Sequence, residues 1–464
     1  MGGKIGNNFL TFFNTVIITR YLGPEFYGKY TFIIAIVSMV VIFWNFGLGV
    51  LLTRDVSRDP EKIESYIDGV FTIKSAMALI AISVLMFVIY NLDYDQNIVK
   101  CVLLFSIATY FTSISAIFES VFSAFRRMEF SSLLSFLRPI FLFIALSIIV
   151  KMSWGLKGIF YGQLTASFLV LIVSYSIMRK YAKPKISFDL QLIRDLAKKG
   201  FPFLLISIVH IILFKIDHIM ISAMVGDKEL GLYGAAYTIL EIIITFFPML
   251  IVMSAYPVLS NLYKNDKQEM SNIFHVLFKN LMLIGIPASC GILYLGKEII
   301  IFTYGKEYLE AGIFLSILGC SIWLYFISLL MAWTLTAMNK QNLVLFLNVI
   351  LMIMNIVTNI YAIKKYGAIG AAVTTGICTF SGVIALCYIL IKEKMKLIKI
   401  KELSKIIFSS VVMVLSIFLM KNNFKISNAT ISLFAIIIIS IIVYFGMVYM
   451  FKLIRKNEIK FLLK

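Results

Sequence analysis

The chain has 464 residues, of which 61% are hydrophobic and 14% are charged, and its mean hydropathy is +0.95. A soluble domain is nearer half apolar and a quarter charged, so this composition excludes an ordinary soluble protein. The formal net charge of +19 would suggest nucleic-acid binding in a soluble chain, but here the Lys and Arg residues lie mostly in short segments between long apolar runs. We therefore predict an all-α polytopic membrane protein that binds no nucleic acid.

Long apolar runs occur along the whole chain. Residues 32–43 are apolar except for Ser38, and residues 431–451 carry no charge. Runs of about 20 apolar residues are typical of membrane helices. We predict about 14 transmembrane helices, at residues 5–21, 30–52, 67–91, 98–122, 133–151, 156–178, 201–224, 231–256, 275–295, 312–337, 343–363, 368–391, 404–421 and 429–451. The first lacks the features of a cleavable signal peptide, so we expect it to be a span.

The basic residues predict the orientation of the chain. Lys and Arg are concentrated in alternate loops, which is the positive-inside pattern. We expect a multi-pass protein of the cell (plasma or inner) membrane with both termini in the cytoplasm. The basic runs 179–199 and 392–405 are interpreted first as topology signals, and contact with anionic lipid headgroups is compatible with that role. The five cysteines and three histidines are not spaced as metal ligands or as a disulfide framework, so no metal site is predicted.

A glycine motif occurs twice, each time after the first predicted span of one half of the chain. The two copies are LGPEFYGKY at residues 22–30 and VGDKELGLY at residues 225–233. At an offset of 203 positions, the corresponding glycines are Gly23 and Gly28 in the first copy and Gly226 and Gly231 in the second. Each glycine alone is explained by close packing of helices or turns, but that does not explain why the motif recurs.

Two weaker pairs keep the same order. WGLKG at 154–158 corresponds to YGAIG at 366–370, and SAFRR at 123–127 corresponds to TAMNK at 336–340. We therefore predict two parallel six-helix repeats plus two C-terminal helices. Because six is an even number, both repeats begin on the same side of the membrane. The predicted domains are an N-terminal six-helix lobe at 1–182, a cytoplasmic amphipathic linker at 183–200, a C-terminal six-helix lobe at 201–391 and two additional helices at 392–464.

Three segments resemble a known family. TRYLGPEFYGKYTF at 19–32, KIDHIMISAMVGDKELGLYGAAYTI at 215–239 and YGAIGAAVTT at 366–375 are similar to the polysaccharide, or oligosaccharide-lipid, flippases. Their superfamily also contains the lipid II flippases and the multidrug and toxin extruders. The resemblance runs from about residue 5 to 391. It implies a central cavity between two lobes, lined with basic residues, and a substrate in which sugars are carried on a polyprenyl phosphate or diphosphate.

Charged side chains inside predicted spans are candidates for function, because a charge in hydrocarbon is costly unless it is paired or faces water. Arginine is well suited to gripping the phosphate of such a substrate, since it stays charged and binds bidentately. The candidates for the substrate path or cavity are Arg20, Arg54, Lys74 and Lys215. The candidates for ion coupling are Asp217, Glu241 and Glu119.

Each candidate also has a structural explanation. The two arginines and Lys215 could extend long side chains to the membrane surface. Lys74 and Glu119 could pair with each other instead of facing the path. Asp217 could form a buried pair between two helices, but not with Lys215, which lies about 160° away around the same helix. Asn14 corresponds to Asp217 at the 203-residue offset, which places a polar group at matching points of the two halves.

The function predicted from these observations is a flippase that moves a polyprenyl-(di)phosphate-linked oligosaccharide from the cytoplasmic to the outer leaflet by alternating access of two lobes. The alternatives are an ion-coupled drug extruder, a lipid II flippase or, less favoured, a membrane glycan polymerase or glycosyltransferase. The sequence has no P-loop, so we expect no cofactor and predict coupling to a cation gradient or to the membrane potential. The expected partners are the lipid-linked substrate, membrane lipids and glycan-assembly proteins.

Overall fold

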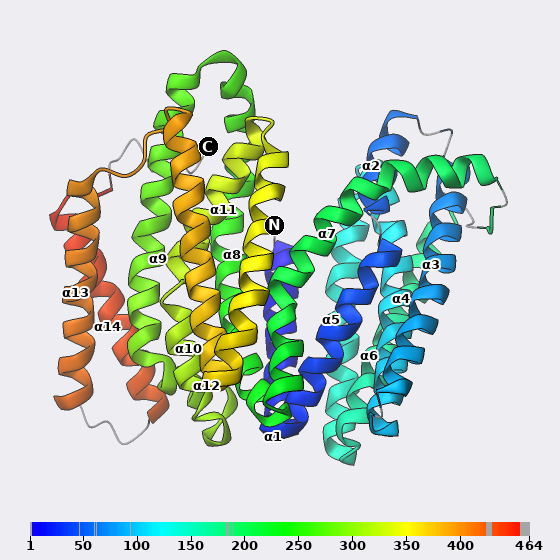
Figure 1. Ribbon diagram of the computed structural model, residues 1–464, viewed down its shortest axis with the longest axis horizontal. Coiled ribbons are helices and arrows are strands. Elements are labelled where there is room, and N and C mark those ends of the chain that lie inside the picture. Colours follow the sequence, from blue (N-terminus) through cyan, green and yellow to red (C-terminus); the bar gives the residue numbers. More distant parts are fainter. Residues whose placement is uncertain are drawn as a thin grey trace. The chain divides into compact units, whose positions relative to one another are not determined.

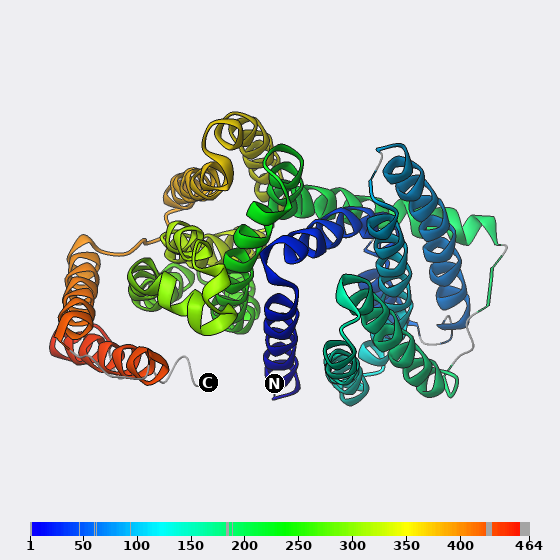
Figure 2. The ribbon, with the colours of Figure 1, turned by 90° about the horizontal axis from the view of Figure 1, so that it is seen from below.

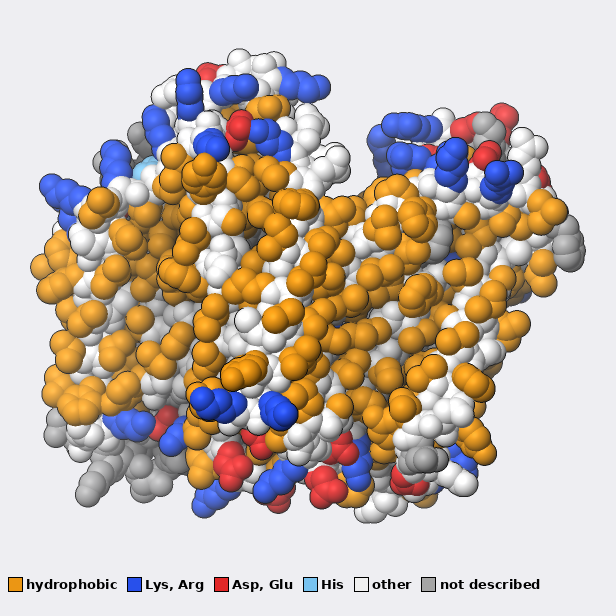
Figure 3. Space-filling view, viewed as in Figure 1, with side chains coloured by type: hydrophobic (Ala, Val, Ile, Leu, Met, Phe, Trp, Pro, Cys, Tyr) orange, Lys and Arg blue, Asp and Glu red, His pale blue; other side chains and the backbone are white. Residues whose placement is uncertain are grey.

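The fold is helical, as the apolar runs predicted (Figure 1). The computed structural model describes residues 2–45, 47–59, 61, 63–92, 94–181, 185–187, 189–423 and 429–454, and no strand occurs among them. In Figure 3, charged side chains gather at the two ends of each unit's helices, and hydrophobic side chains cover the surface between these ends. This distribution is typical of membrane helices, and the predicted all-α polytopic membrane fold is confirmed.

Packing divides the chain into two compact units, Met1–Gly231 and Leu232–Lys464. The first unit contains α1 (Gly2–Asn45), α2 (Leu48–Arg58), α3 (Ile63–Asn91), α4 (Gln96–Ala124), α5 (Met128–Met152), α6 (Gly155–Met178) and α7 (Leu190–Met224). Helix α7 packs against α1, α2 and α3 of this unit. The predicted boundaries after residues 182, 200 and 391 concern the sequence repeat and stay a prediction. Residues 1, 46, 60, 62, 93, 182–184, 188, 424–428 and 455–464 of the predicted domains lie outside the described residues.

Two helices are long enough to contain two predicted spans each. Helix α1 has 44 residues and turns at Gly23, whose φ is 68° and which precedes Pro24. Helix α12 (Gln341–Lys392) has 52 residues and turns at Gly367, whose φ is 61°. An unbroken helix of 52 residues would be about 78 Å long, more than twice the thickness of the hydrocarbon layer. The two glycines therefore separate the predicted spans 5–21 from 30–52 and 343–363 from 368–391.

The number of spans depends on these breaks. Eleven of the helices in the described part of the chain are long and apolar enough to cross a membrane, or twelve if α10 (Ala311–Gly319) and α11 (Ile322–Ala337) form one broken span. Dividing α1 and α12 at their glycines accords with the predicted spans, except that the predicted span 30–52 runs past the end of α1 at Asn45 into α2, which begins at Leu48. The count of about fourteen itself stays a prediction.

The duplicated glycine motif forms a contact between its own two copies. An added Cβ at Gly28 would lie 1.7 Å from the carbonyl oxygen of Asp227, and one at Gly231 would lie 1.8 Å from the carbonyl oxygen of Pro24. Asp227 corresponds to Pro24 at the same 203-residue offset, so exchanging the two turns converts one contact into the other. Only glycine allows the backbones to approach this closely.

Gly23 and Gly226 have a different role from the second glycine of each motif. Both adopt a positive φ, of 68° and 125° respectively. An added Cβ at Gly226 would meet nothing within 4 Å. Both glycines therefore suit the conformation of the turn, and at Gly226 close packing is not the reason for glycine.

The predicted amphipathic stretch forms the beginning of α7. The Asp189 carboxylate caps this helix by accepting hydrogen bonds from the backbone N–H groups of Gln191 and Leu192. Leu196 is almost completely buried, and an added Cβ at Gly69 of α3 would lie 2.8 Å from its side chain. The apolar face of the stretch therefore packs onto α3.

An aspartate also caps the start of α4, at the position before Gln96. The backbone N–H of Asn97 donates to the Asp95 carboxylate at 3.1 Å. This hydrogen bond, with a second from the Asn97 side chain, holds the pKa of Asp95 below its usual range. The cap supplies an acceptor where the first turn of the helix has free N–H groups.

The second unit is arranged around α9 (Lys267–Tyr304). It contains most of α8 (Asp227–Asn265), then η2 (Lys306–Tyr308), α10, α11, α12, α13 (Ile400–Asn423) and α14 (Ala429–Met450). Helix α9 packs against α10, α11, α13 and α14, and Figures 1 and 2 show α13 and α14 side by side at one edge of this unit. His275 of α9 lies 3.1 Å from Glu402 of α13. The two added helices are thus attached to the unit through α9.

Helices α10 and α11 form a bent pair where the sequence predicts one continuous span. They meet at an angle of 45°. The backbone N–H groups in the first turn of α11 have no partner within the helix. One of them, that of Trp323, donates to the Ser289 hydroxyl of α9 at 3.1 Å. This partner on another helix lowers the cost of interrupting a helix among apolar surroundings.

Candidate functional site

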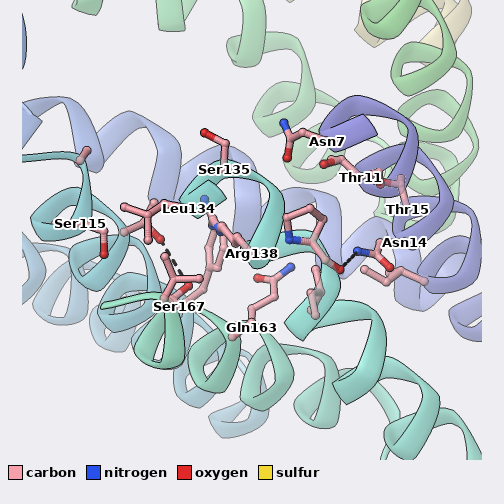
Figure 4. Close-up of a pocket in the computed structure, with 18 of the residues that line it drawn as sticks. Asn7, Thr11, Asn14, Thr15, Ser115, Leu134, Ser135, Arg138, Gln163 and Ser167 are labelled. Atoms are coloured by element: carbon pink, nitrogen blue, oxygen red, sulfur yellow. Dashed lines mark hydrogen bonds between the residues drawn. The ribbon is translucent and has the colours of Figure 1, made fainter. Parts of the chain in front are cut away.

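A cavity of about 530 Å³ lies in the first unit, where α1, α4, α5 and α6 meet (Figure 4). Small-molecule sites in proteins typically have volumes of about 300–1,000 Å³. The polar residues in its wall are Asn7, Thr11, Asn14, Thr15, Tyr30, Thr112, Ser115, Glu119, Ser135, Arg138, Gln163 and Ser167. Because unsatisfied polar groups are costly among apolar helices, such a cavity favours a polar occupant, either water or a ligand.

Two opposite charges share this cavity. Arg138 belongs to α5 and Glu119 to α4. The charges attract each other, yet neither side chain forms a hydrogen bond or ion pair with any residue that the structure describes. Arg138 is exposed within the wall, and Figure 4 shows it in the middle of the labelled residues. Its guanidinium donors are therefore available to an occupant of the cavity.

Two amide side chains in the wall donate a hydrogen bond through the nitrogen, while the oxygen accepts none. The Asn14 amide nitrogen donates to the Pro139 carbonyl oxygen at 2.8 Å, and the Gln163 amide nitrogen donates to the Tyr30 hydroxyl at 2.9 Å. The amide oxygens of Asn14 and Gln163 are buried, and neither has a hydrogen-bond donor among the described residues. Since an unsatisfied buried acceptor costs about 1–3 kcal/mol, both oxygens favour an incoming donor.

The hydroxyl groups of the wall also act mainly as acceptors. Thr15, Thr112, Ser115 and Ser135 each donate to the carbonyl oxygen four residues earlier in the same helix. A hydroxyl has only one proton but two lone pairs, so these oxygens can still accept a hydrogen bond. The cavity thus combines one arginine with a wall rich in acceptors.

Of the seven charged candidates from the sequence, Glu119 lines the cavity. Lys74 instead lies buried between helices. Its ammonium nitrogen donates to the Asn45 side-chain oxygen at 3.3 Å and to the carbonyl and hydroxyl oxygens of Ser113 at 3.1 and 3.0 Å. Lys74 therefore links α1, α3 and α4 in this conformation, and the structure does not bring it into an ion pair with Glu119.

We expect Lys74→Met to lower the free energy of unfolding by about 1–3 kcal/mol, because the buried oxygens of Ser113 would lose their charged donor. The measurement is thermal unfolding of the purified protein in detergent. Lys151→Met, at an exposed position near the end of α5, is the matched control. Equal unfolding temperatures for the two variants would contradict the structural role of Lys74.

The remaining candidates lie outside the cavity. Arg20 is exposed on α1, and Lys215 and Glu241 are half-buried on α7 and α8. The Arg54 guanidinium donates to its neighbour Asp55 at 2.7 Å. One Asp217 carboxylate oxygen accepts the backbone N–H of His218 at 2.9 Å and lies 2.8 Å from the His218 ring nitrogen Nδ1. The roles predicted for these residues stay predictions.

Arg138 is not among the candidates predicted from the sequence. Its signal was present, because a charge lies inside the predicted span 133–151, directly before Pro139. Gln163 gives a weaker signal, since an uncharged amide is common enough in membrane helices that it does not indicate a site. Asn14 was noticed only as the counterpart of Asp217 in the repeat, whereas the structure places it in the cavity wall.

Two compact helical units with a polar cavity among apolar helices define a multi-pass membrane protein that can house a polar ligand. The chain belongs to the polysaccharide biosynthesis protein family, whose model matches residues 1–263, more than half of its length. A second family model, MatE, matches residues 202–361.

Individual relatives agree with this assignment. The chain is 22% identical to the capsular polysaccharide biosynthesis protein CapF of Staphylococcus aureus, over 80% of this chain and 93% of that protein. It is 24% identical to the probable flippase AglR of Haloferax volcanii, over 81% of this chain and 78% of the relative. Among solved structures, the lipid II flippase MurJ in an inward closed conformation has the same fold, with a TM-score of 0.82, 20% identity and 97% coverage of both chains. The family resemblance seen in the sequence is confirmed.

Proposed function

We propose that this protein is a flippase that moves a polyprenyl-(di)phosphate-linked oligosaccharide from the cytoplasmic to the outer leaflet. The observation that carries the proposal is the cavity, in which Arg138 has no hydrogen-bond partner among the described residues and the amide oxygens of Asn14 and Gln163 lack donors there. Relatives whose names refer to capsular polysaccharide biosynthesis and to flippases support transport rather than glycan polymerisation. The cell membrane, with both termini in the cytoplasm, is the proposed location, and glycan-assembly proteins are proposed partners.

The cavity matches the physical problem that a flippase must solve. The lipid tail can stay in the bilayer, but the sugars and phosphates need polar partners to cross about 30 Å of hydrocarbon. Arg138 can donate two parallel hydrogen bonds to neighbouring sugar oxygens. Sugar hydroxyls can donate to the amide oxygens of Asn14 and Gln163 and to the Glu119 carboxylate. We propose that alternating access of the two repeats opens this path to one leaflet at a time.

The direct test is transbilayer movement of a fluorescent polyprenyl-diphosphate oligosaccharide in liposomes that contain the purified protein. We expect movement that depends on the protein. Folded protein that moves none of several headgroups would overturn the proposal and favour first cation export and then an enzymatic role. Lipid II belongs in the same assay as a second substrate, because the fold match to a lipid II flippase covers 97% of the chain. Faster movement of lipid II would favour that alternative.

The proposed energy source is a cation gradient or the membrane potential, with Asp217, Glu241 and Glu119 as candidate ion-binding residues. We expect Asp217→Asn to make movement insensitive to an imposed cation gradient while the protein stays folded, because the amide cannot carry the negative charge. Asp195→Asn, at an exposed position on the same helix, is the matched control. An unchanged response to the gradient in Asp217→Asn would remove Asp217 from the coupling mechanism.

A further inference from the structure

We infer that the cavity of the first unit accepts an uncharged, hydroxyl-rich sugar residue, and that Glu119 excludes acidic sugars from it. This inference rests on the proposed flippase function and specifies which part of the substrate this site recognises. Three features of the wall support it: the balance of charges, the excess of acceptors and the fixed orientation of the Asn14 amide.

The charges in the wall cancel. Among the described residues that line the cavity, Arg138 is the one cation and Glu119 is the one anion. A neutral ligand leaves this balance unchanged, whereas a ligand carboxylate adds a second negative charge beside Glu119. Like charges in a partly desolvated site repel each other strongly, and repulsion of a wrong ligand is an effective source of specificity.

The hydrogen-bonding capacity of the wall also favours a neutral sugar. Thr15, Thr112, Ser115 and Ser135 have their protons engaged by helix carbonyls, so these hydroxyls offer mainly lone pairs. A sugar hydroxyl can donate to such oxygens and can accept from Arg138 in the same complex. An ionised carboxylate can only accept, so an acidic sugar offers the wall one donor fewer than the neutral sugar and adds an acceptor that competes for Arg138.

The Asn14 amide makes this preference a fixed property of the wall. Its nitrogen donates to the Pro139 carbonyl oxygen, which can only accept. Rotating this amide to present its N–H groups to an anion would therefore break the bond. At Asn14 the wall cannot adapt to an acidic sugar without losing a hydrogen bond between α1 and α5.

The test compares two polyprenyl-diphosphate disaccharides that differ only in a terminal glucose or glucuronic acid. In liposomes, the unaltered protein is expected to move the glucose lipid at least about tenfold faster than the glucuronate lipid. Glu119→Gln, which keeps the shape of the side chain and removes its charge, should narrow this ratio to about twofold by accelerating the glucuronate lipid. Glu129→Gln, on the exposed surface beside Arg127, should leave the ratio unchanged.

The outcomes separate this inference from the proposed function. Equal movement of both lipids by the unaltered protein, or faster movement of the glucuronate lipid, would overturn the charge filter while the flippase function stands. Movement of neither lipid by folded protein would overturn the proposed function itself. If Glu119→Gln stops the movement of both lipids, the test is inhibition of the unaltered protein by methyl glucoside and methyl glucuronide. The charge filter then requires the glucoside to inhibit movement of the glucose lipid at a concentration at least about tenfold lower than the glucuronide.

Discussion

Arg138→Gln is expected to slow transbilayer movement of the lipid-linked oligosaccharide by about tenfold to a hundredfold, because each hydrogen bond from a charged donor contributes about 1.5–3 kcal/mol. Glutamine keeps a polar side chain in the wall but removes the charge and the bidentate fork. The Arg138 side chain forms no hydrogen bond or ion pair with other described residues, so the fold should lose little. The measurement is the initial rate of movement in liposomes, normalised to the amount of folded protein.

Arg127→Gln is the matched control for this substitution. Arg127 immediately precedes α5, is exposed, and pairs with Glu129 at 3.3 Å outside the cavity. Its replacement should leave the rate within about twofold, as expected for an exposed ion pair. Arg138→Lys should give an intermediate rate, since lysine keeps the charge and loses the planar fork. A rate for Arg138→Gln equal to that of Arg127→Gln would show that the cavity is not on the substrate path.

Gly28→Ala and Gly231→Ala are each expected to destabilise the protein by about 3 kcal/mol or more, at or above the upper end of the usual cost of overpacking. The added methyl groups would lie 1.7 Å and 1.8 Å from backbone carbonyl oxygens. Neither obstacle is a flexible side chain that could rotate away, so the two turns must separate. We expect a large fall in the unfolding temperature, or loss of folded protein, measured in detergent after purification.

Two further glycines control for the general effect of adding a methyl group in this chain. An added Cβ at Gly291 or Gly446 would meet nothing within 4 Å. Alanine at either position should be neutral or slightly stabilising, because it has the higher helix propensity. Gly226→Ala tests backbone strain without a clash, since Gly226 has a φ of 125° and free space around it. If Gly28→Ala unfolds at the same temperature as Gly291→Ala, the turns do not pack as described.

Much of the fold could be predicted because its signals are local. Apolar runs gave the helices, and the amphipathic stretch before the second half proved to be the start of α7, with Leu196 buried against α3. The repeated glycines were also predictable, because a positive φ or a close backbone approach restricts a position to glycine. The break between α10 and α11 was not, because it depends on Ser289, a partner on another helix.

The candidate site was less predictable, because a cavity is created by the convergence of helices that are distant in sequence. Glu119 was a candidate simply as an embedded charge, and so was Lys74, yet one lines the cavity and the other is enclosed by Asn45 and Ser113. Hydropathy assigns both residues a similar free-energy cost of burial in a membrane span. It cannot tell which of them faces a cavity. The unsatisfied oxygens of Asn14 and Gln163 became visible only once their nitrogen partners on other helices were known.

The reciprocal contact of the two glycine turns bears on how the chain arose. In an isologous interface, which identical subunits form about a two-fold axis, residue i of one copy contacts residue j of the other, and residue j of the first copy contacts residue i of the second. Gly28 with Asp227 and Gly231 with Pro24 form such a pair within one chain. If the two predicted six-helix repeats come from one duplicated unit, a pair of such units would make both contacts from a single glycine. After fusion of two such genes, separate codons would encode the two copies of that glycine. Each copy would still be restricted to glycine by the backbone of the turn that it contacts.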